Sequence, residues 1–304
     1  MIKSRKYSFV EIEICNMCGQ PTVGNKAMGI RLNRSQGFHP KSKKGIAVSV
    51  IKCRNCKLIY SDPMPMPESI QDHYDIPPEE YWNAKNFDWN KQYFSKEIQT
   101  LRQLMNFRPG MKALDIGAGL GRTMISLEKA GFETYGFEPS FPFYQRAIEK
   151  MKIDPARLKN GSIENMEYEA GSFDLISFGA VLEHLYDPSK SIESALTWLK
   201  TGGIIHIEVP SSNHFPTRLI NFFYRLNGTH YVSNLSPMHS PFHLYEFNIK
   251  SFEKLSGRLH YSIAFSNIEV CEILNFPRFL HPFLKKWMSW TNSGLQLIVY
   301  LKKL

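Results

Sequence analysis

Short apolar runs alternate with stretches of helical spacing through the middle of the chain. Residues 113–116 and 134–138 form compact runs typical of buried strands, and apolar side chains between residues 122 and 130 recur at helical intervals. A second set follows, with a helical pattern that begins at Pro188 and an apolar run at 204–210. This alternation predicts an α/β domain built on a doubly wound, mostly parallel sheet.

Patterns on both flanks of this region predict further elements. Residues 57–67 begin as a short strand, and the prolines that follow predict that regular structure stops there. A helical repeat over residues 93–105 leads to a turn before the first central strand. Later in the chain, the apolar run 296–301 suits the centre of a sheet, and residues 261–265 could pair beside it.

The bulk composition is that of a folded globular protein. Hydrophobic residues make up 43% of the 304 residues and charged residues 21%, which argues against disorder. The formal net charge of +9 favours an anionic partner such as nucleic acid, a phosphorylated compound or a lipid surface, or it reflects a basic surface without a specific partner. Because the basic residues are dispersed, the charge argues against nucleic acid as the partner.

The sequence also predicts in which cellular compartment the protein is found. Residues 9–14 alternate with acidic side chains and cannot form the apolar core of a signal peptide. We find no stretch long and apolar enough to span a bilayer. We therefore expect a cytoplasmic protein, in which thiols stay reduced and paired cysteines hold metal more often than they form disulfides.

Four cysteines form two C-x-x-C pairs in the first quarter of the chain. Cys15 and Cys18 make the first pair, and Cys53 and Cys56 make the second. A two-residue spacer lets both thiolates of a pair point at one ion, so two pairs complete a tetrahedral shell for Zn²⁺. Four thiolates leave no open coordination position, so this zinc would be structural; the alternative is four free or redox-active cysteines.

A glycine-rich loop follows the first central strand. Its sequence, Gly117-Ala118-Gly119-Leu120-Gly121, has the spacing G-x-G-x-G in place of the G-x-G-x-x-G expected where a pyrophosphate rests on a helix N-terminus. Glu138 ends the next strand, about twenty residues further on, where a carboxylate can accept both hydroxyls of a ribose. The combination predicts a site for a nucleoside without a diphosphate; the alternative is an ordinary tight turn.

These segments resemble the class I S-adenosylmethionine-dependent methyltransferases. Residues 114–121 resemble motif I of that family, and the similarity continues through residues 161–166, 172–178, 180–185 and 199–210. The resemblance implies a Rossmann-like sheet of seven strands that binds S-adenosylmethionine at the carboxyl ends of its strands.

Residue roles follow from the same resemblance. Asp115 and the loop from Gly117 to Gly121 would hold the methionine part of the cofactor, and Glu138 would hold the ribose. The complete set of predicted cofactor residues is Asp115, Gly117, Ala118, Gly119, Gly121, Glu138, Pro139, Ser162, Ile163, Glu164, Gly179 and Ala180.

The adenine contacts depart from the family pattern at one position. Pro139 and Ile163 would flank the adenine ring. Ser162 stands where many relatives carry Asp to bind the adenine amino group. The serine hydroxyl or the neighbouring Glu164 must then take that role.

The cysteine pairs carry a second resemblance. Together with residues 58–63 they resemble the zinc-binding leader of bacterial methyltransferases that serve sugar and surface-polysaccharide biosynthesis. This implies a small, zinc-ribbon-like module over residues 1–75 and a methyltransferase domain over residues 76–304, with elements facing the methyl acceptor in about 211–292. The acceptor would be a small molecule, a sugar or a glycan, methylated at oxygen ahead of carbon or nitrogen.

Two histidines are candidates for a general base. Methyl transfer from a sulfonium is an in-line displacement in which the enzyme mainly aligns the reactants, and a base helps only when the acceptor must lose a proton. His184 follows the fourth strand, at the edge where ligands bind. His243 lies in a segment that resembles an acceptor-side motif of the family. For His184, the alternative is a structural hydrogen bond at a helix start.

Two other functions are compatible with the sequence. An RNA methyltransferase would suit zinc and a basic charge, but the chain lacks the aromatic-and-proline tetrad typical of base-amine methylation. A non-catalytic protein that binds S-adenosylmethionine is the second alternative, and the intact glycine loop and Glu138 argue against it. The aromatic, basic stretches 215–226 and 276–290 either make peripheral contact with a membrane or form a lid and its packing face. The sequence makes no prediction of oligomeric state.

Overall fold

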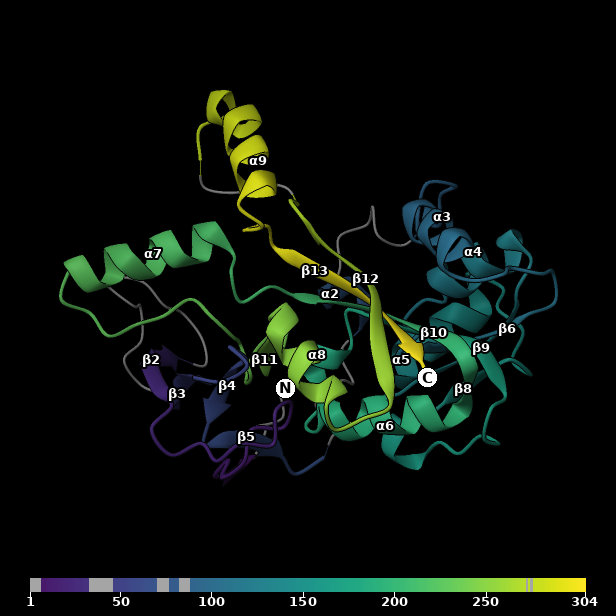
Figure 1. The fold of residues 1–304 in the computed structure, drawn as a ribbon, viewed down its shortest axis with the longest axis horizontal. Coiled ribbons are helices and arrows are strands. Elements are labelled where there is room, and N and C mark those ends of the chain that lie inside the picture. Colours follow the sequence, from purple (N-terminus) through teal and green to yellow (C-terminus); the bar gives the residue numbers. More distant parts are fainter. Residues whose placement is uncertain (1–6, 33–45, 70–76, 82–87, 272, 274–275) are drawn as a thin grey trace.

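A seven-stranded sheet with helices on both faces forms the body of the molecule (Figure 1). The architecture is that of a computed structural model, which describes residues 7–32, 46–69, 77–81, 88–271, 273 and 276–304. The predicted boundary near residue 75 lies outside these described residues.

The central sheet has the strand order β12-β13-β10-β9-β6-β7-β8. Neighbouring strands run parallel from β8 to β10, and β13 lies antiparallel between β10 and β12. The prediction of a Rossmann-like, mostly parallel sheet is confirmed, as is the pairing of the two late apolar runs. The strands are β6 Lys112–Ile116, β7 Glu133–Glu138, β8 Leu158–Asn160, β9 Phe173–Gly179, β10 Leu199–Pro210, β12 Tyr261–Glu269 and β13 Gln296–Lys303.

Alternate residues of each strand face opposite layers of helices. In β9, Ile176 and Phe178 pack in the core under α6 and α8, whereas Leu175 packs in the core under α3 and α4. The α-helices are α2 Pro78–Tyr81, α3 Ser95–Leu104, α4 Arg122–Ala130, α5 Phe141–Glu149, α6 Pro188–Trp198, α7 Phe215–Leu226, α8 Ile249–Ser256 and α9 His281–Trp290, and the 3₁₀ turns are η2 Ile163–Asn165, η3 Leu182–His184 and η4 Arg278–Leu280.

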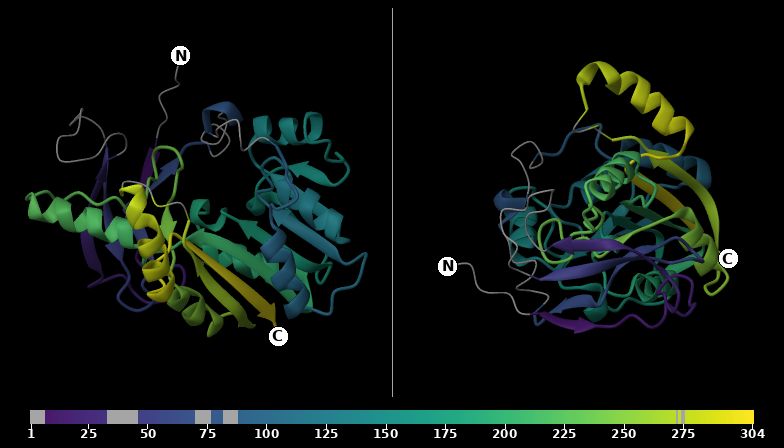
Figure 2. Two further views of the ribbon diagram at one scale, coloured as in Figure 1. Left: turned by 90° about the horizontal axis from the view of Figure 1, so that it is seen from above. Right: turned by 90° about the vertical axis from the view of Figure 1, so that its left-hand side faces the viewer.

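Helix α9 stands out from the rest of the fold, with α7 lying beside it (Figure 1, Figure 2). No helix in the part of the chain that the structure describes is long and apolar enough to cross a bilayer.

Three of the N-terminal strands share a sheet with a strand from the later part of the chain. A four-stranded sheet of order β11-β4-β3-β2 joins β2 Lys26–Leu32, β3 Ala47–Lys52 and β4 Ile59–Asp62 to β11 Tyr245–Glu246 from the later part of the chain. In this sheet Tyr245 pairs with Tyr60, and Glu246 pairs with Ile59. The cysteine-containing segment is therefore integrated with the rest of the fold through backbone hydrogen bonds.

Regular structure continues through the prolines that were expected to end it. β5 Met64–Pro67 pairs antiparallel with β1 Tyr7–Val10 in a separate two-stranded sheet. The prediction was wrong because each strand of a two-stranded sheet has an open edge, where a proline without an N–H group is tolerated.

Strand β10 also starts earlier than predicted. Helix α6 ends at Trp198 and the strand begins at Leu199, with a shift in its pairing with β9 between Leu199 and Ile204. Residues 199–203, which precede the predicted run at 204–210, thus form an irregular start of the strand, in which Gly202 adopts φ 79°.

Candidate functional site

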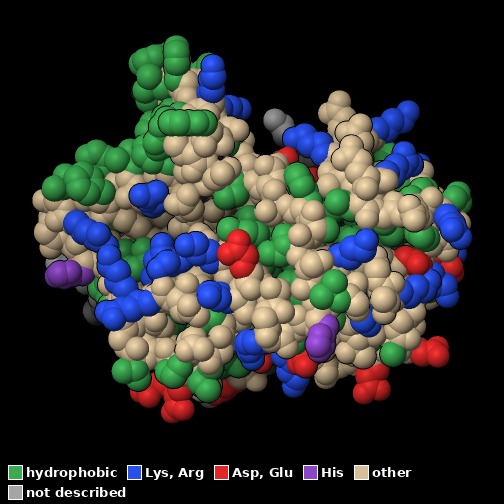
Figure 3. Space-filling model, viewed as in Figure 1, with side chains coloured by type: hydrophobic (Ala, Val, Ile, Leu, Met, Phe, Trp, Pro, Cys, Tyr) green, Lys and Arg blue, Asp and Glu red, His purple; other side chains and the backbone are tan. Residues whose placement is uncertain are grey.

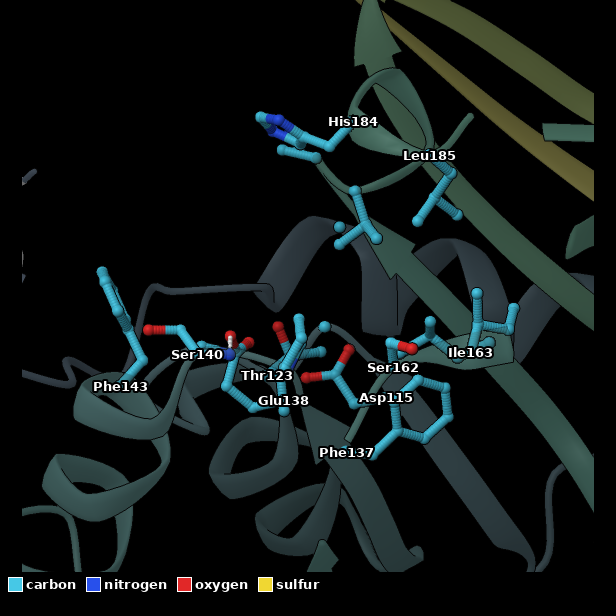
Figure 4. A pocket seen from close by; sticks show the side chains of 18 of the residues that line it. Asp115, Thr123, Phe137, Glu138, Ser140, Phe143, Ser162, Ile163, His184 and Leu185 are labelled. Carbon is cyan, nitrogen blue, oxygen red and sulfur yellow. Dashed lines mark hydrogen bonds between the residues drawn. The ribbon is translucent and has the colours of Figure 1, made fainter. Parts of the chain in front are cut away.

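A cavity of about 480 Å³ opens at the carboxyl ends of β6, β7 and β9. Its size lies within the range of small-molecule sites. All of the predicted cofactor residues except Gly121 line it, and so do His184 and His243. His184 lies across the cavity from Glu138 (Figure 4). The structure therefore brings together residues that the sequence places far apart.

Gly117 and Gly121 are each required to be glycine, but for different structural reasons. Gly117 adopts φ 65°, and a Cβ atom there would lie 2.6 Å from Cγ2 of Val181, so no larger residue fits beside the cavity. Gly121 does not line the cavity. It is the N-cap of α4 with φ 76°, and its Cβ would lie 2.6 Å from Cγ1 of Ile153, so its role is to let the helix pack closely.

Glu138 is held in place by backbone amides. Its carboxylate accepts hydrogen bonds from the N–H groups of Gly119 and Ser140, each at 2.8 Å. Burial raises the pKa of Glu138 to about 7, against the opposing effect of these two donors. A carboxylate has more lone pairs than two donors use, so it can still accept from ligand hydroxyls.

Asp115 stands at the end of a buried polar row. It pairs in register with Ser177, and Ser177 pairs with His206 on the next strand. Ser177 donates to Asp115, so its oxygen accepts from Nδ1 of His206, 3.2 Å away. Burial raises the pKa of Asp115 to about 8, so a cationic ligand group would favour its ionised form.

The residues predicted around adenine follow strand β8. Ile163 is buried at the start of η2. Ser162 and Glu164 both line the cavity on either side of it, and Pro139 lines it from the end of β7. The Ser162 hydroxyl and the Glu164 carboxyl group, the two predicted partners of the adenine amino group, thus both lie at the cavity wall.

Glu183 joins the two predicted histidines in one cluster. Its Oε1 lies 3.9 Å from Nε2 of His184 and 3.8 Å from Nε2 of His243. The Glu183 side chain is 2% exposed, and its Oε2 has no hydrogen-bond partner among the described residues. No local sequence signal marks Glu183, although it stands next to His184, because its place in the cluster depends on a histidine sixty positions away.

Burial keeps this cluster uncharged near neutral pH. It lowers the pKa of His184 to about 4 and that of His243 to about 3, and it raises the pKa of Glu183 to about 8. The ring of His184 is also tied down, since its Nδ1–H donates to the Phe242 carbonyl oxygen at 3.3 Å. Neutral imidazoles can accept a proton, and two imidazoles with a carboxylate are also a ligand set that divalent metals use.

Aromatic side chains form much of the wall of the cavity. No local motif in the sequence predicts them, because they come from segments before α3, within α5, after η3 and before β11. The aromatic residues that line the cavity include Tyr93, Phe94, Phe143, Tyr186 and Phe242.

The four cysteines meet in one buried cluster. Sγ of Cys15 lies 3.6 Å from Sγ of Cys56, and Sγ of Cys18 lies 3.7 Å from Sγ of Cys53. These separations are far from the ~2.05 Å of a disulfide. They match the roughly 3.8 Å between sulfurs of a tetrahedral site with Zn–S bonds of about 2.3 Å. The cluster could therefore bind a metal ion.

The thiols also constrain one another's ionisation. Hydrogen bonding to Cys53 raises the pKa of Cys15 to about 12, and hydrogen bonding to Cys15 raises the pKa of Cys56. Hydrogen bonding from Cys15 lowers the pKa of Cys53. Four thiolates can thus coexist here only when a cation compensates their charge.

The cysteine cluster is tied to the loop that borders the cavity. The hydroxyl of Tyr245 donates to the Tyr186 carbonyl oxygen at 2.9 Å and accepts from Nδ2 of Asn16, between the first two cysteines, at 2.8 Å. Tyr186 itself lines the cavity, two residues after His184. The segment that carries the cysteines is therefore connected by hydrogen bonds to the wall that carries His184.

Comparisons with known proteins agree on one family. The family model described as a methyltransferase domain matches residues 87–255. A ubiquinone biosynthesis O-methyltransferase of Acinetobacter baylyi is 26% identical over 141 residues, which cover 42% of this chain and 53% of that protein. A demethylmenaquinone methyltransferase of Bacillus mycoides is 28% identical over 144 residues, which cover 45% of this chain and 56% of that protein.

The matches to these two curated relatives span about half of each relative's length. Among solved structures, an S-adenosylmethionine-dependent methyltransferase from Archaeoglobus fulgidus superimposes with a TM-score of 0.50 at 16% identity, covering 72% of this chain and 97% of that one. A chain of a methyltransferase–activator complex from Haloferax volcanii also has a TM-score of 0.50, at 15% identity, and covers 77% of this chain and 97% of its own length. These likenesses establish the fold.

Glu183 should make the stability of the protein depend on pH. Its folded-state pKa of about 8 lies above the ordinary value of 4.5, so the native state holds this proton more tightly and loses stability as pH rises through that window. In the wild type, this proton should make the free energy of unfolding fall by up to about 1.4 kcal/mol for each pH unit between the two pKa values. In Glu183→Gln this contribution to the fall should be absent. Urea unfolding at several pH values from 5 to 8 would measure the free energy of unfolding of both proteins.

The matched control is Glu193→Gln on the exposed side of α6. Its free energy of unfolding should run parallel to that of the wild type at every pH. If the Glu183→Gln curve also stayed parallel, Glu183 would not titrate in this window.

Proposed function

The chain belongs to the methyltransferase domain family, and from that membership we propose that it transfers a methyl group from S-adenosylmethionine to an oxygen of a small-molecule acceptor. The observation that carries this proposal is the shared cavity. The glycine loop and Glu138 line one part of it, and the two histidines line another. Within this class of acceptors, the resemblance of the cysteine leader favours a sugar or glycan hydroxyl.

The cavity residues fit the cofactor by chemistry. Glu138, fixed by two amides, would take the ribose hydroxyls, and Asp115 would face the methionine ammonium group, which favours the ionised form of this buried acid. The close approach of Gly117 to Val181 leaves the loop backbone bare for the ligand. When bound, S-adenosylmethionine supplies a methyl group activated on a sulfonium.

His243 is the residue that would take the acceptor's proton. Its side chain is 28% exposed against 14% for His184, and the ring of His184 is held by the Phe242 carbonyl group. Burial keeps His243 in the neutral form that a base requires. An imidazolium formed at His243 would favour the ionised form of Glu183, whose Oε1 lies 3.8 Å from Nε2 of His243 and would then stabilise the new positive charge. His184 would position this pair.

The four cysteines would hold a structural zinc ion. Their sulfur separations and buried position support this assignment, because a closed shell of four thiolates suits zinc without leaving a position for a substrate. The ion would fix the segment that carries Asn16 and, through Tyr245, the wall of the cavity.

Removing the charge of Glu138 should weaken cofactor binding. Glu138→Gln keeps the shape of the side chain and weakens its hydrogen bonds to the ribose, so the Kd for S-adenosylmethionine should rise about ten- to a hundredfold by isothermal titration calorimetry. Glu149→Gln, exposed at the end of α5, should bind like the wild type. A wild-type protein that binds no S-adenosylmethionine would overturn the proposed function.

The two histidines should separate by their effects on catalysis. His243→Gln should lower kcat by about 10² to 10⁴ and alter its pH profile, while the Kd for S-adenosylmethionine stays within about twofold of the wild type. His184→Gln should lower kcat less. Mass spectrometry of products from nucleotide sugars, short oligosaccharides and small hydroxy compounds would identify an acceptor for this assay.

His260→Gln, at an exposed position, is the control for a histidine substitution that leaves the cavity intact. An unchanged rate and pH profile in both cavity variants would show that the acceptor needs no base from either histidine.

Metal analysis tests the cysteine cluster. Elemental mass spectrometry of the purified protein should find about one zinc per chain, and Cys53→Ser should lose it together with thermal stability. Cys271→Ser, outside the cluster, should keep the metal. Protein that folds and binds S-adenosylmethionine fully without any metal would exclude a structural zinc.

A further inference from the structure

Helix α7 buries a polar residue and exposes large apolar ones. The buried side carries Asn221, whose Nδ2 donates to Oδ1 of Asn234 at 2.6 Å and whose Oδ1 accepts from the backbone N–H of Ser233 at 2.7 Å. The outward side carries Phe222 and Leu226, which are 53% and 65% exposed. A helix that faces water normally shows the opposite arrangement, so this apolar side indicates contact with something other than water.

Helix α9 repeats this feature. Phe283, Trp287 and Trp290 follow the spacing i, i+4, i+7, which places them on one face of the helix. They are 76%, 41% and 81% exposed, whereas Met288 is buried on another side. The preceding turn η4 adds Phe279, which is 74% exposed.

The two helices make one continuous surface. The ring centroids of Phe215 at the start of α7 and Trp287 on α9 lie 4.5 Å apart. Figure 3 shows hydrophobic side chains gathered over both helices, with Lys and Arg beside them. We use the term apolar patch for the exposed residues Phe222, Phe223, Leu226, Phe279, Phe283, Trp287 and Trp290.

The charged residues in the chain segments that carry this patch are all cations. The sequence holds no Asp or Glu in residues 209–245 or in residues 273–304. The exposed cations on and next to the two helices are Arg218, Arg225, Arg278, Lys285 and Lys286. Tryptophan and phenylalanine beside lysine and arginine are the side chains that settle at the interface of an anionic bilayer.

We propose that α7 and α9 seat the protein on the surface of an anionic lipid bilayer, with the apolar patch at the level of the headgroups. Charge selects this occupant over a second copy of the chain, because a symmetric pair would bring the same five cations of each copy together. The described helices cannot cross a bilayer, so the contact is peripheral. The proposal goes beyond methyl transfer and does not depend on it.

Helix α7 is also linked to the wall of the cavity. After α7 the chain runs on to Pro241, Phe242 and His243, which line the cavity. Asn221 on the inward side of α7 is hydrogen-bonded to Ser233 and Asn234 in this connecting segment, so the helix proposed to contact the membrane also contacts the chain that leads to the proposed base.

Sedimentation with vesicles tests the proposal on the full chain. The wild type should bind vesicles of phosphatidylglycerol and phosphatidylcholine, bind vesicles of phosphatidylcholine alone at least tenfold more weakly, and lose affinity as salt is raised. Phe283→Ser with Trp290→Ser should lower the affinity for the anionic vesicles at least tenfold. Lys285→Glu with Lys286→Glu should do the same, and this charge pair is exposed, so its effect does not require any change in the core.

Matched controls lie elsewhere on the surface. Val23→Ser, at a side chain 94% exposed, and Lys250→Glu with Lys254→Glu on α8 should leave vesicle binding unchanged. Absence of wild-type binding to the anionic vesicles would overturn the proposal, and so would equal binding by the patch variants. A dimer in sedimentation velocity that the aromatic variant breaks, without vesicle binding, would assign the patch to a second copy instead.

Discussion

The exclusion of water from three carboxyl groups is the constraint on which this site depends. Asp115 and Glu138 stand at the ends of β6 and β7, and Glu183 lies in η3, just after β9. Each is almost fully buried, and burial raises the pKa of each toward or above neutrality. Such groups cost stability in the folded protein unless they receive hydrogen bonds or face a cation. Ligand hydroxyls, an ammonium group or a proton could each reduce this cost.

The protein relieves this cost in different ways at each carboxyl group. Two backbone amides hold Glu138, and one of them belongs to the glycine loop, so the carboxylate also fixes the loop's position. Ser177 supports Asp115 from the neighbouring strand. Glu183 faces two neutral imidazoles, which gives that corner the means to hold a proton during a reaction. The three carboxyl groups thus differ in their neighbours, which are backbone amides at Glu138, a serine at Asp115 and two histidines at Glu183.

The cysteine cluster and the outward face of α7 and α9 act at a distance from this cavity. The cysteines lie in the same hydrophobic core as the central strands, and the Tyr245 hydroxyl carries their support to the loop beside His184. Helix α7, which carries part of the apolar patch, is hydrogen-bonded through Asn221 to Ser233 and Asn234 in the segment that leads to His243. Both features are thus connected to segments that line the cavity near Tyr186 and His243.

The sequence by itself determined the elements whose signals are local. The cysteine pairs, the glycine loop, Glu138 and the alternation of strands and helices follow from spacing and periodicity within short segments, and the structure brings them together as those patterns predict. Tertiary structure alone decided the rest. It paired Tyr245 with Tyr60, set Glu183 against His243, let β5 continue through its prolines, and turned the apolar side of α7 outward. Periodicity reveals that a helix has two different faces, but which face is covered depends on contacts between residues far apart in the chain.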